Sequence, residues 1–128
     1  MFEVKKFGRH ANLILKKINM QKGVIYTNTQ TVPGREIVEI LGIVTGNVVQ
    51  TKHLGKDIMA VLKSVVGGEI VGYTEMLTEA RQKAISRMVV AAREMDADAV
   101  VNLRFTTSSI MSNASEILAY GTAVKLKP

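Results

Sequence analysis

The spacing of hydrophobic residues predicts strands in the segment that follows residue 23. Residues 24–27 form a short β-rich run that ends in polar residues. Residues 35–51 are rich in Ile and Val, but Gly42 and Gly46 interrupt them. Glycine within a strand pattern is typical of a bend, a bulge or the close approach of another backbone. The segment is therefore either one long bent strand or two strands joined at residues 45–47.

The apolar spacing then changes to three and four residues, which predicts two helices. The shorter covers about residues 54–65 and ends before Gly67-Gly68. The longer runs from about Thr74, a suitable N-cap, to about Asp96. It has one apolar stripe that is rich in alanine, so we expect it to lie close against a sheet. The stripe consists of Leu77, Ala80, Ala84, Ile85, Met88, Ala91, Ala92 and Met95.

Two strands are expected at the end of the chain, over residues 99–105 and 116–124, with a polar loop over residues 107–115. The second of these strands is apolar on both faces. One long helix can cover only one face of a sheet, so the other face needs a partner. This pattern predicts a homo-oligomer.

The basic charge of the chain is concentrated near its start. The formal net charge is +6, and residues 1–23 hold six basic side chains against Glu3 alone. The remaining residues hold 11 basic and 10 acidic side chains, which leaves no excess for a phosphate-binding face. We interpret residues 1–23 as a leader that is disordered or not native, and residues 24–128 as one domain. A basic amphipathic helix carrying Leu13, Ile14 and Ile18 is the alternative.

Composition narrows the location and the partners further. The chain has no cysteine, so it has neither disulfides nor a thiolate metal site, which fits a reducing cytoplasm. No apolar run approaches the roughly 20 residues of a membrane-spanning helix. We therefore expect a cytoplasmic protein with no nucleic acid and no membrane as partner.

Six stretches along the chain, taken in order, carry a family pattern: Pro33-Gly34, ILGIVTGNVV at 40–49, LGKDI at 54–58, VGGEI at 66–70, YTEMLTEAR at 73–81 and EILAYGTAV at 116–124. They resemble the YbjQ-like family, whose name includes the words "putative heavy-metal-binding". The resemblance covers about residues 24–126 and leaves out the leader. It implies compact α+β subunits that assemble into pentameric rings, with no established enzymatic activity.

A soft-metal site within one subunit has little support from these residues, since soft metals prefer thiolate, thioether or imidazole ligands. His10 and His53 are not at a metal-ligand spacing, and the methionines are interpreted as core residues. In a ring, one ligand from each subunit repeated around the axis would form a cluster suited to a divalent metal ion. The candidate ligands are His53, Asp57, Glu69, Glu75, Glu79 and Glu116.

Each candidate also has a structural interpretation. Glu69, Glu75 and Glu79 can be a solvated helix start that complements the helix dipole. Glu116 can pair with Arg104 across the final hairpin.

No arrangement of a nucleophile with a base, and no phosphate-binding loop, is evident in the sequence, so we do not expect an enzyme.

These patterns predict an α+β fold in which a small, mostly antiparallel sheet, in the order β-β-α-α-β-β, packs on one long helix and the subunits form a ring. The expected function is binding of a metal ion or small ligand at subunit interfaces. The alternative is a structural or interaction ring without a ligand.

Overall fold

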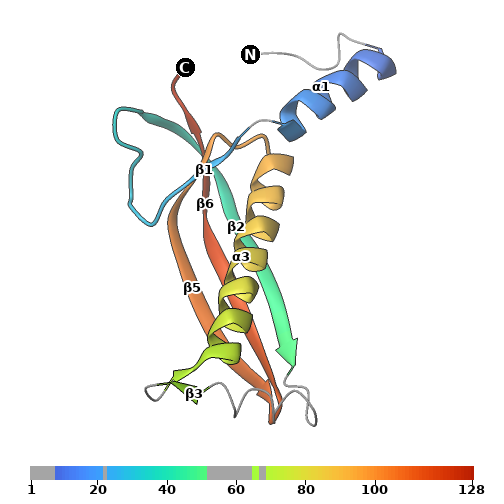
Figure 1. The fold of residues 1–128 in the computed structure, drawn as a ribbon. Coiled ribbons are helices and arrows are strands. Elements are labelled where there is room, and N and C mark those ends of the chain that lie inside the picture. The colour runs from blue at the N-terminus through green and yellow to red at the C-terminus, as the bar shows by residue number, and fades with distance from the viewer. Residues whose placement is uncertain (1–7, 22, 52–64, 67–68) are drawn as a thin grey trace.

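The structure is a computed structural model that describes residues 8–21, 23–51, 65–66 and 69–128. One long helix lies along one face of a four-stranded sheet with the strand order β1-β5-β6-β2 (Figure 1). A two-stranded ladder of β3 and β4 precedes the long helix, and a further helix, α1, lies before the sheet. The elements are α1 (Arg9–Gln21), β1 (Ile25–Tyr26), β2 (Ile37–Thr51), β3 (Val65–Val66), β4 (Glu69–Ile70), α3 (Val71–Glu94), β5 (Ala99–Met111) and β6 (Ala114–Leu126).

The predicted α+β class and the packing of one long helix on a sheet are confirmed, but the predicted element order is only partly right. β1 pairs in parallel with β5, so the sheet is mixed. The β3–β4 ladder was not expected, and Val65, the predicted end of the short helix, lies in a strand. The rest of that predicted helix falls outside the described residues.

The contact between α3 and the sheet is built from small residues. Ala80, Ala84 and Ala92 on α3 are fully buried, and Met88 is the largest side chain among them. On the sheet, Gly46 of β2 lies so close to α3 that an added Cβ would overlap the backbone of Ala84 and Met88. Residues 37–51 of the predicted segment 35–51 thus form one long strand, and the expected close approach of another backbone occurs at Gly46.

The other glycine of β2 lies at a bulge. The register between β2 and β6 shifts between Ile40 and Gly42, and Gly42 has a φ of 142°, which favours glycine. The bulge ends the strict alternation of β2, so Val44 and Val48 face α3 while Ile40 and Ile43 do not.

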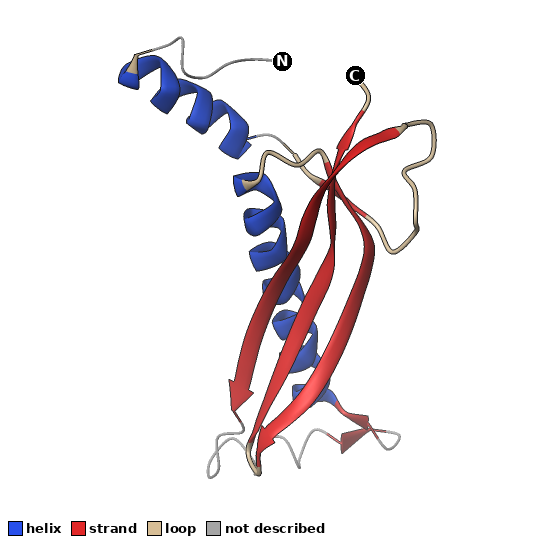
Figure 2. Ribbon diagram, turned by 180° about the vertical axis from the view of Figure 1, so that it is seen from behind, coloured by secondary structure: helices blue, strands red, loops and turns tan. Residues whose placement is uncertain are grey.

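A second, smaller core lies on the face of the sheet away from α3. Val32, in the connection between β1 and β2, packs over Val124 and Leu126 of β6. The sequence predicted that only a partner could cover the outer face of the last strand. This is wrong for the C-terminal end of β6, because the connection between β1 and β2 folds back over that end. Figure 2 shows this connection bulging from one end of the sheet and leaving the rest of the face uncovered.

Only the start of α3 differs from the prediction. The helix begins at Val71, so Thr74 is not its N-cap. Thr74 lies within the helix, where its backbone carbonyl accepts a hydrogen bond from the Thr78 hydroxyl. At the other end, the N–H groups of Asp96 and Ala97 donate to the carbonyls of Arg93 and Ala92. This is the Schellman arrangement, with Asp96 at φ 59° in the place that glycine usually takes.

The final hairpin is longer than expected. Residues 107–111, predicted as loop, continue β5 and pair with β6 up to Met111 opposite Ala114. Their threonines and serines looked like loop residues, but Thr is also favoured in strands and the pairing partner stabilises the extension.

Candidate functional site

The outer edge of the sheet carries the most exposed large apolar side chains of the described residues. β2 is the last strand in the sheet, and no described strand lies beyond it. Ile40 and Ile43 of β2 are 73% and 77% exposed, and Val38 and Val49 are also exposed. Exposed apolar residues along a sheet edge are typical of an association surface, because an uncovered edge offers both backbone hydrogen bonds and apolar area.

A polar arrangement on the same sheet face surrounds Glu116. The Asn47 side-chain amide donates to Glu116 Oε2 at 3.2 Å. Glu116 lies opposite Val49 on one side and Ser108 on the other, and is half-buried. The carboxylate thus lies on the face of the sheet away from α3, beside the exposed edge of β2, where a metal ion or the polar group of a ligand can approach it.

A side chain of α3 is hydrogen-bonded to the backbone of β2 at Asn47. Arg87 Nη1 donates to the backbone carbonyl of Asn47 at 2.6 Å. One end of the β2 backbone is therefore already hydrogen-bonded to a side chain, while Ile40 and Ile43 lie nearer the other end.

The structure separates the remaining candidate ligands. Glu75 and Glu79 lie exposed on α3, on the opposite side of the sheet from Glu116, because the neighbouring Ile117 faces α3. Glu69 lies in β4, of which only the backbone is described. His53 and Asp57 lie outside the described residues. Among the residues that the structure does describe, no three His, Cys, Asp or Glu side chains are close enough to hold one metal ion.

The predicted pairing of Glu116 with Arg104 is wrong. Arg104 lies opposite Tyr120, four residues further along β6, and its Nη1 donates to the carbonyls of Asn28 and Leu103 at 2.9 and 3.0 Å. The actual partner of Glu116, Asn47, was missed. Residues 45–47 looked like a possible turn, and only the pairing of β2 with β6 shows that Asn47 shares a face with Glu116.

A shallow hollow lies on the opposite edge of the molecule. It has a volume of about 250 Å³ and forms between Tyr26 of β1 and the outward side of α3. Tyr26 is 50% exposed and Val90 is similarly exposed, so the hollow is a second surface with apolar character. Its other lining residues are Gln82, Ile85, Ser86, Val89 and Arg93.

The sequence profile of the family YbjQ_1, described as "Putative heavy-metal-binding", matches residues 24–127. The chain belongs to this family. The predicted resemblance is confirmed, and α1 lies before the matched residues.

Relatives from distant organisms share most of the domain. A "UPF0145 protein" from Psychromonas ingrahamii is 69% identical over 104 residues, which cover 81% of this chain and 99% of that protein. One from Archaeoglobus fulgidus is 60% identical over 108 residues, covering 84% of this chain and 100% of that protein. These family members are similar to the present chain over nearly their whole length, and α1 is the main part of it without a counterpart.

A solved structure supports the fold. The crystal structure of a protein with unknown function from the DUF74 family of Pediococcus pentosaceus superposes with a TM-score of 0.51 at 16% sequence identity. The superposition covers 83% of this chain and 100% of that one. No described helix of the present chain combines the length and the apolar character that a membrane crossing requires.

Proposed function

We propose that this protein is a cytoplasmic homo-oligomer, a pentameric ring, that binds a metal ion or small ligand where its subunits meet, and that it catalyses no reaction. The observation that carries the proposal is the exposure of Ile40 and Ile43 on the outer strand of the sheet. Burying such side chains against a second copy removes apolar area from water, at about 25 cal/mol for each Å².

The position of the two apolar surfaces supports a ring rather than a symmetric dimer. Ile43 lies on β2 and Tyr26 lies on β1, and these strands form opposite edges of the sheet. Contact between two different surfaces is head-to-tail, and head-to-tail contacts close into rings when the rotation between copies allows it. The number five comes from the family resemblance.

Glu116 is the best-supported ligand for a site between subunits. It is half-buried, bonded to Asn47, and lies on the uncovered face near the proposed contact. Repeated by symmetry, one carboxylate from each subunit gives an oxygen cluster of the kind that hard or borderline divalent cations prefer. Glu75 and Glu79 are exposed on α3, on the other side of the sheet, and have weaker support.

Native mass spectrometry of protein purified without chelator tests both parts of the proposal. We expect a multiple of the 14.0 kDa subunit with added mass that corresponds to a bound metal or ligand. A Glu116→Gln variant should keep the assembly and lose the added mass, while the control Glu75→Gln should keep both. A wild-type monomer at micromolar concentration would overturn the assembly, and an unchanged adduct in Glu116→Gln would overturn the site.

A ring that presents a surface to another macromolecule, without a ligand, is the second candidate. The exposed apolar side chains of β2, which include Val38 and Val49 as well as Ile40 and Ile43, would suit contact with another macromolecule. A clean oligomer with no added mass in the same spectra would support it.

A further inference from the structure

The helix α1 is an addition to the family domain with its own chemical character. It spans Arg9–Gln21, before the residues that match the family. The basic excess of the chain lies in the segment that contains it, since residues 1–23 hold six basic side chains and one acidic side chain. The domain fold and the proposed assembly do not account for this helix.

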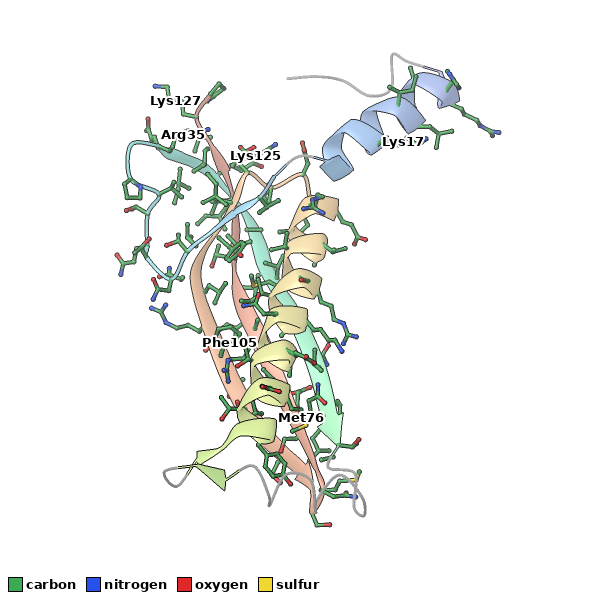
Figure 3. All side chains as sticks on the ribbon, in the orientation of Figure 1. Lys17, Arg35, Met76, Phe105, Lys125 and Lys127 are labelled. Carbon is green, nitrogen blue, oxygen red and sulfur yellow. The ribbon has the colours of Figure 1, made fainter. Side chains whose placement is uncertain are left out.

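The structure leaves apolar and basic side chains of α1 exposed together. Leu13 is 61% exposed and Ile14 is 47% exposed. Arg9 and Lys17, one turn before Leu13 and one turn after it, are also exposed. Figures 1 and 2 show α1 extending from one end of the molecule, away from the sheet, and Figure 3 shows Lys17 on this projecting helix.

We propose that α1 attaches this protein to anionic lipid surfaces. α1 is amphipathic, and an amphipathic helix with Lys and Arg side chains can lie in the plane of a membrane interface, with its apolar residues at the boundary between headgroups and acyl chains. Lys and Arg side chains on such a helix are attracted by the negative potential of anionic lipids. Arg9, Leu13 and Lys17 recur every four residues and share one side of α1, so the two basic side chains flank Leu13 and can extend to the headgroups while Leu13 and Ile14 enter the interface.

The apolar residues decide between a lipid surface and nucleic acid as the partner. A nucleic acid would neutralise Arg9 and Lys17 but would leave Leu13 and Ile14 in water, since phosphate contacts supply non-specific affinity. A lipid interface accommodates both kinds of side chain. The inference departs from the expectation of no membrane partner, because the sequence alone favoured a leader without a role, whereas the structure has a helix there.

Vesicle flotation with the full chain tests the inference. We would use vesicles of phosphatidylcholine with about one-third phosphatidylserine, and vesicles of phosphatidylcholine alone, at low salt and at 0.5 M salt. A polar double variant, L13Q/I14Q, removes the apolar pair and keeps the charge. A neutral variant, R9Q/K17Q, removes two charges and keeps the apolar pair. The control R81Q/K83Q removes two charges from the exposed side of α3.

The expected result is binding to the anionic vesicles that is largely lost at high salt and absent from phosphatidylcholine vesicles. Each basic residue near such a surface contributes about fivefold in affinity, so R9Q/K17Q should bind roughly 25-fold more weakly, and R81Q/K83Q should bind like the wild type. L13Q/I14Q should lose at least about tenfold.

Three results would overturn the inference. One is no flotation of the wild type with anionic vesicles. Another is equal loss in R9Q/K17Q and R81Q/K83Q, which would reflect net charge alone. The third is that L13Q/I14Q binds anionic vesicles as well as the wild type does, and that both proteins bind duplex DNA equally well. That result would make α1 a general polyanion-binding segment. Circular dichroism of each variant confirms that the domain is folded.

Discussion

Gly46 of β2 lies against the backbone carbonyl of Ala84 on α3, with no space for a side chain between them. The glycine and the alanine stripe on the helix together set how closely the helix approaches the sheet. Because both sides of this contact are backbone, neither can move aside as a flexible side chain would.

Substitution of Gly46 should therefore destabilise the domain strongly. In Gly46→Ala the new methyl group would overlap Ala84 and Met88 backbone atoms and would force α3 away from β2. We expect a loss of about 3 kcal/mol or more in the free energy of unfolding, at the upper end of overpacking effects. Urea denaturation measures it. Gly23→Ala is the matched control, since nothing lies within 4 Å of its added Cβ; similar losses in both variants would contradict the close contact.

Met88 fills the centre of the same interface. It is fully buried, whereas Met95, seven residues later and just past the end of α3, is 39% exposed. Met88→Ala should leave a cavity and lower the free energy of unfolding by about 2–5 kcal/mol, while Met95→Ala should cost clearly less. Thermal or urea unfolding of the two variants in parallel compares them, and equal effects would mean that Met88 is not at the centre of the core.

The end of α3 offers a test of backbone conformation. Asp96 has a φ of 59° and its carboxylate accepts a bond from Lys125 Nζ at 3.0 Å. Asp96→Asn removes the charge but tolerates the left-handed backbone, so it should cost no more than about 1 kcal/mol, the typical limit for an exposed ion pair. Asp96→Val should cost about 1–2 kcal/mol more because of its branched Cβ. If chemical denaturation finds the Val variant at least as stable as the Asn variant, the left-handed backbone at this position is not the main effect, since both variants lack the ion pair.

Substitution of Ile43 tests the proposed assembly through the dependence of the melting temperature on protein concentration. In an oligomer the melting temperature rises with protein concentration, since dissociation accompanies unfolding. Ile43→Lys should remove this dependence while keeping the secondary structure, because the side chain is exposed within one subunit. Ile43→Val should behave like the wild type. A melting temperature of the wild type that does not change over a hundredfold range of concentration would contradict the assembly.

The elements with a regular pattern were predictable from the sequence. The alanine stripe on α3 and the two glycines of β2 follow from spacing alone, and the structure has the expected close packing and bulge. The start of α3 was missed because Thr74 is a good N-cap residue by type, while the actual start at Val71 follows the β3–β4 ladder.

The surroundings of Glu116 and the second core were harder to predict from the sequence. Asn47 and Glu116 are 69 positions apart in the sequence, and only the strand register brings them together. Val32 covers Val124 and Leu126 only because the irregular connection between β1 and β2 folds back over β6. The spacing of hydrophobic residues does not predict the conformation of such a connection. For this reason the sequence overstated how much of the last strand a partner must cover.

The contact of Gly46 with Ala84 also limits how a ligand can be taken up. A helix and sheet that touch through their backbones have no volume between them for a guest, and opening that layer would cost much of the stability of the domain. If the binding site forms only where copies meet, loading and release would follow association and dissociation of the subunits. The fraction of sites occupied would then depend on the concentration of the protein itself, and dilution alone would release the ligand.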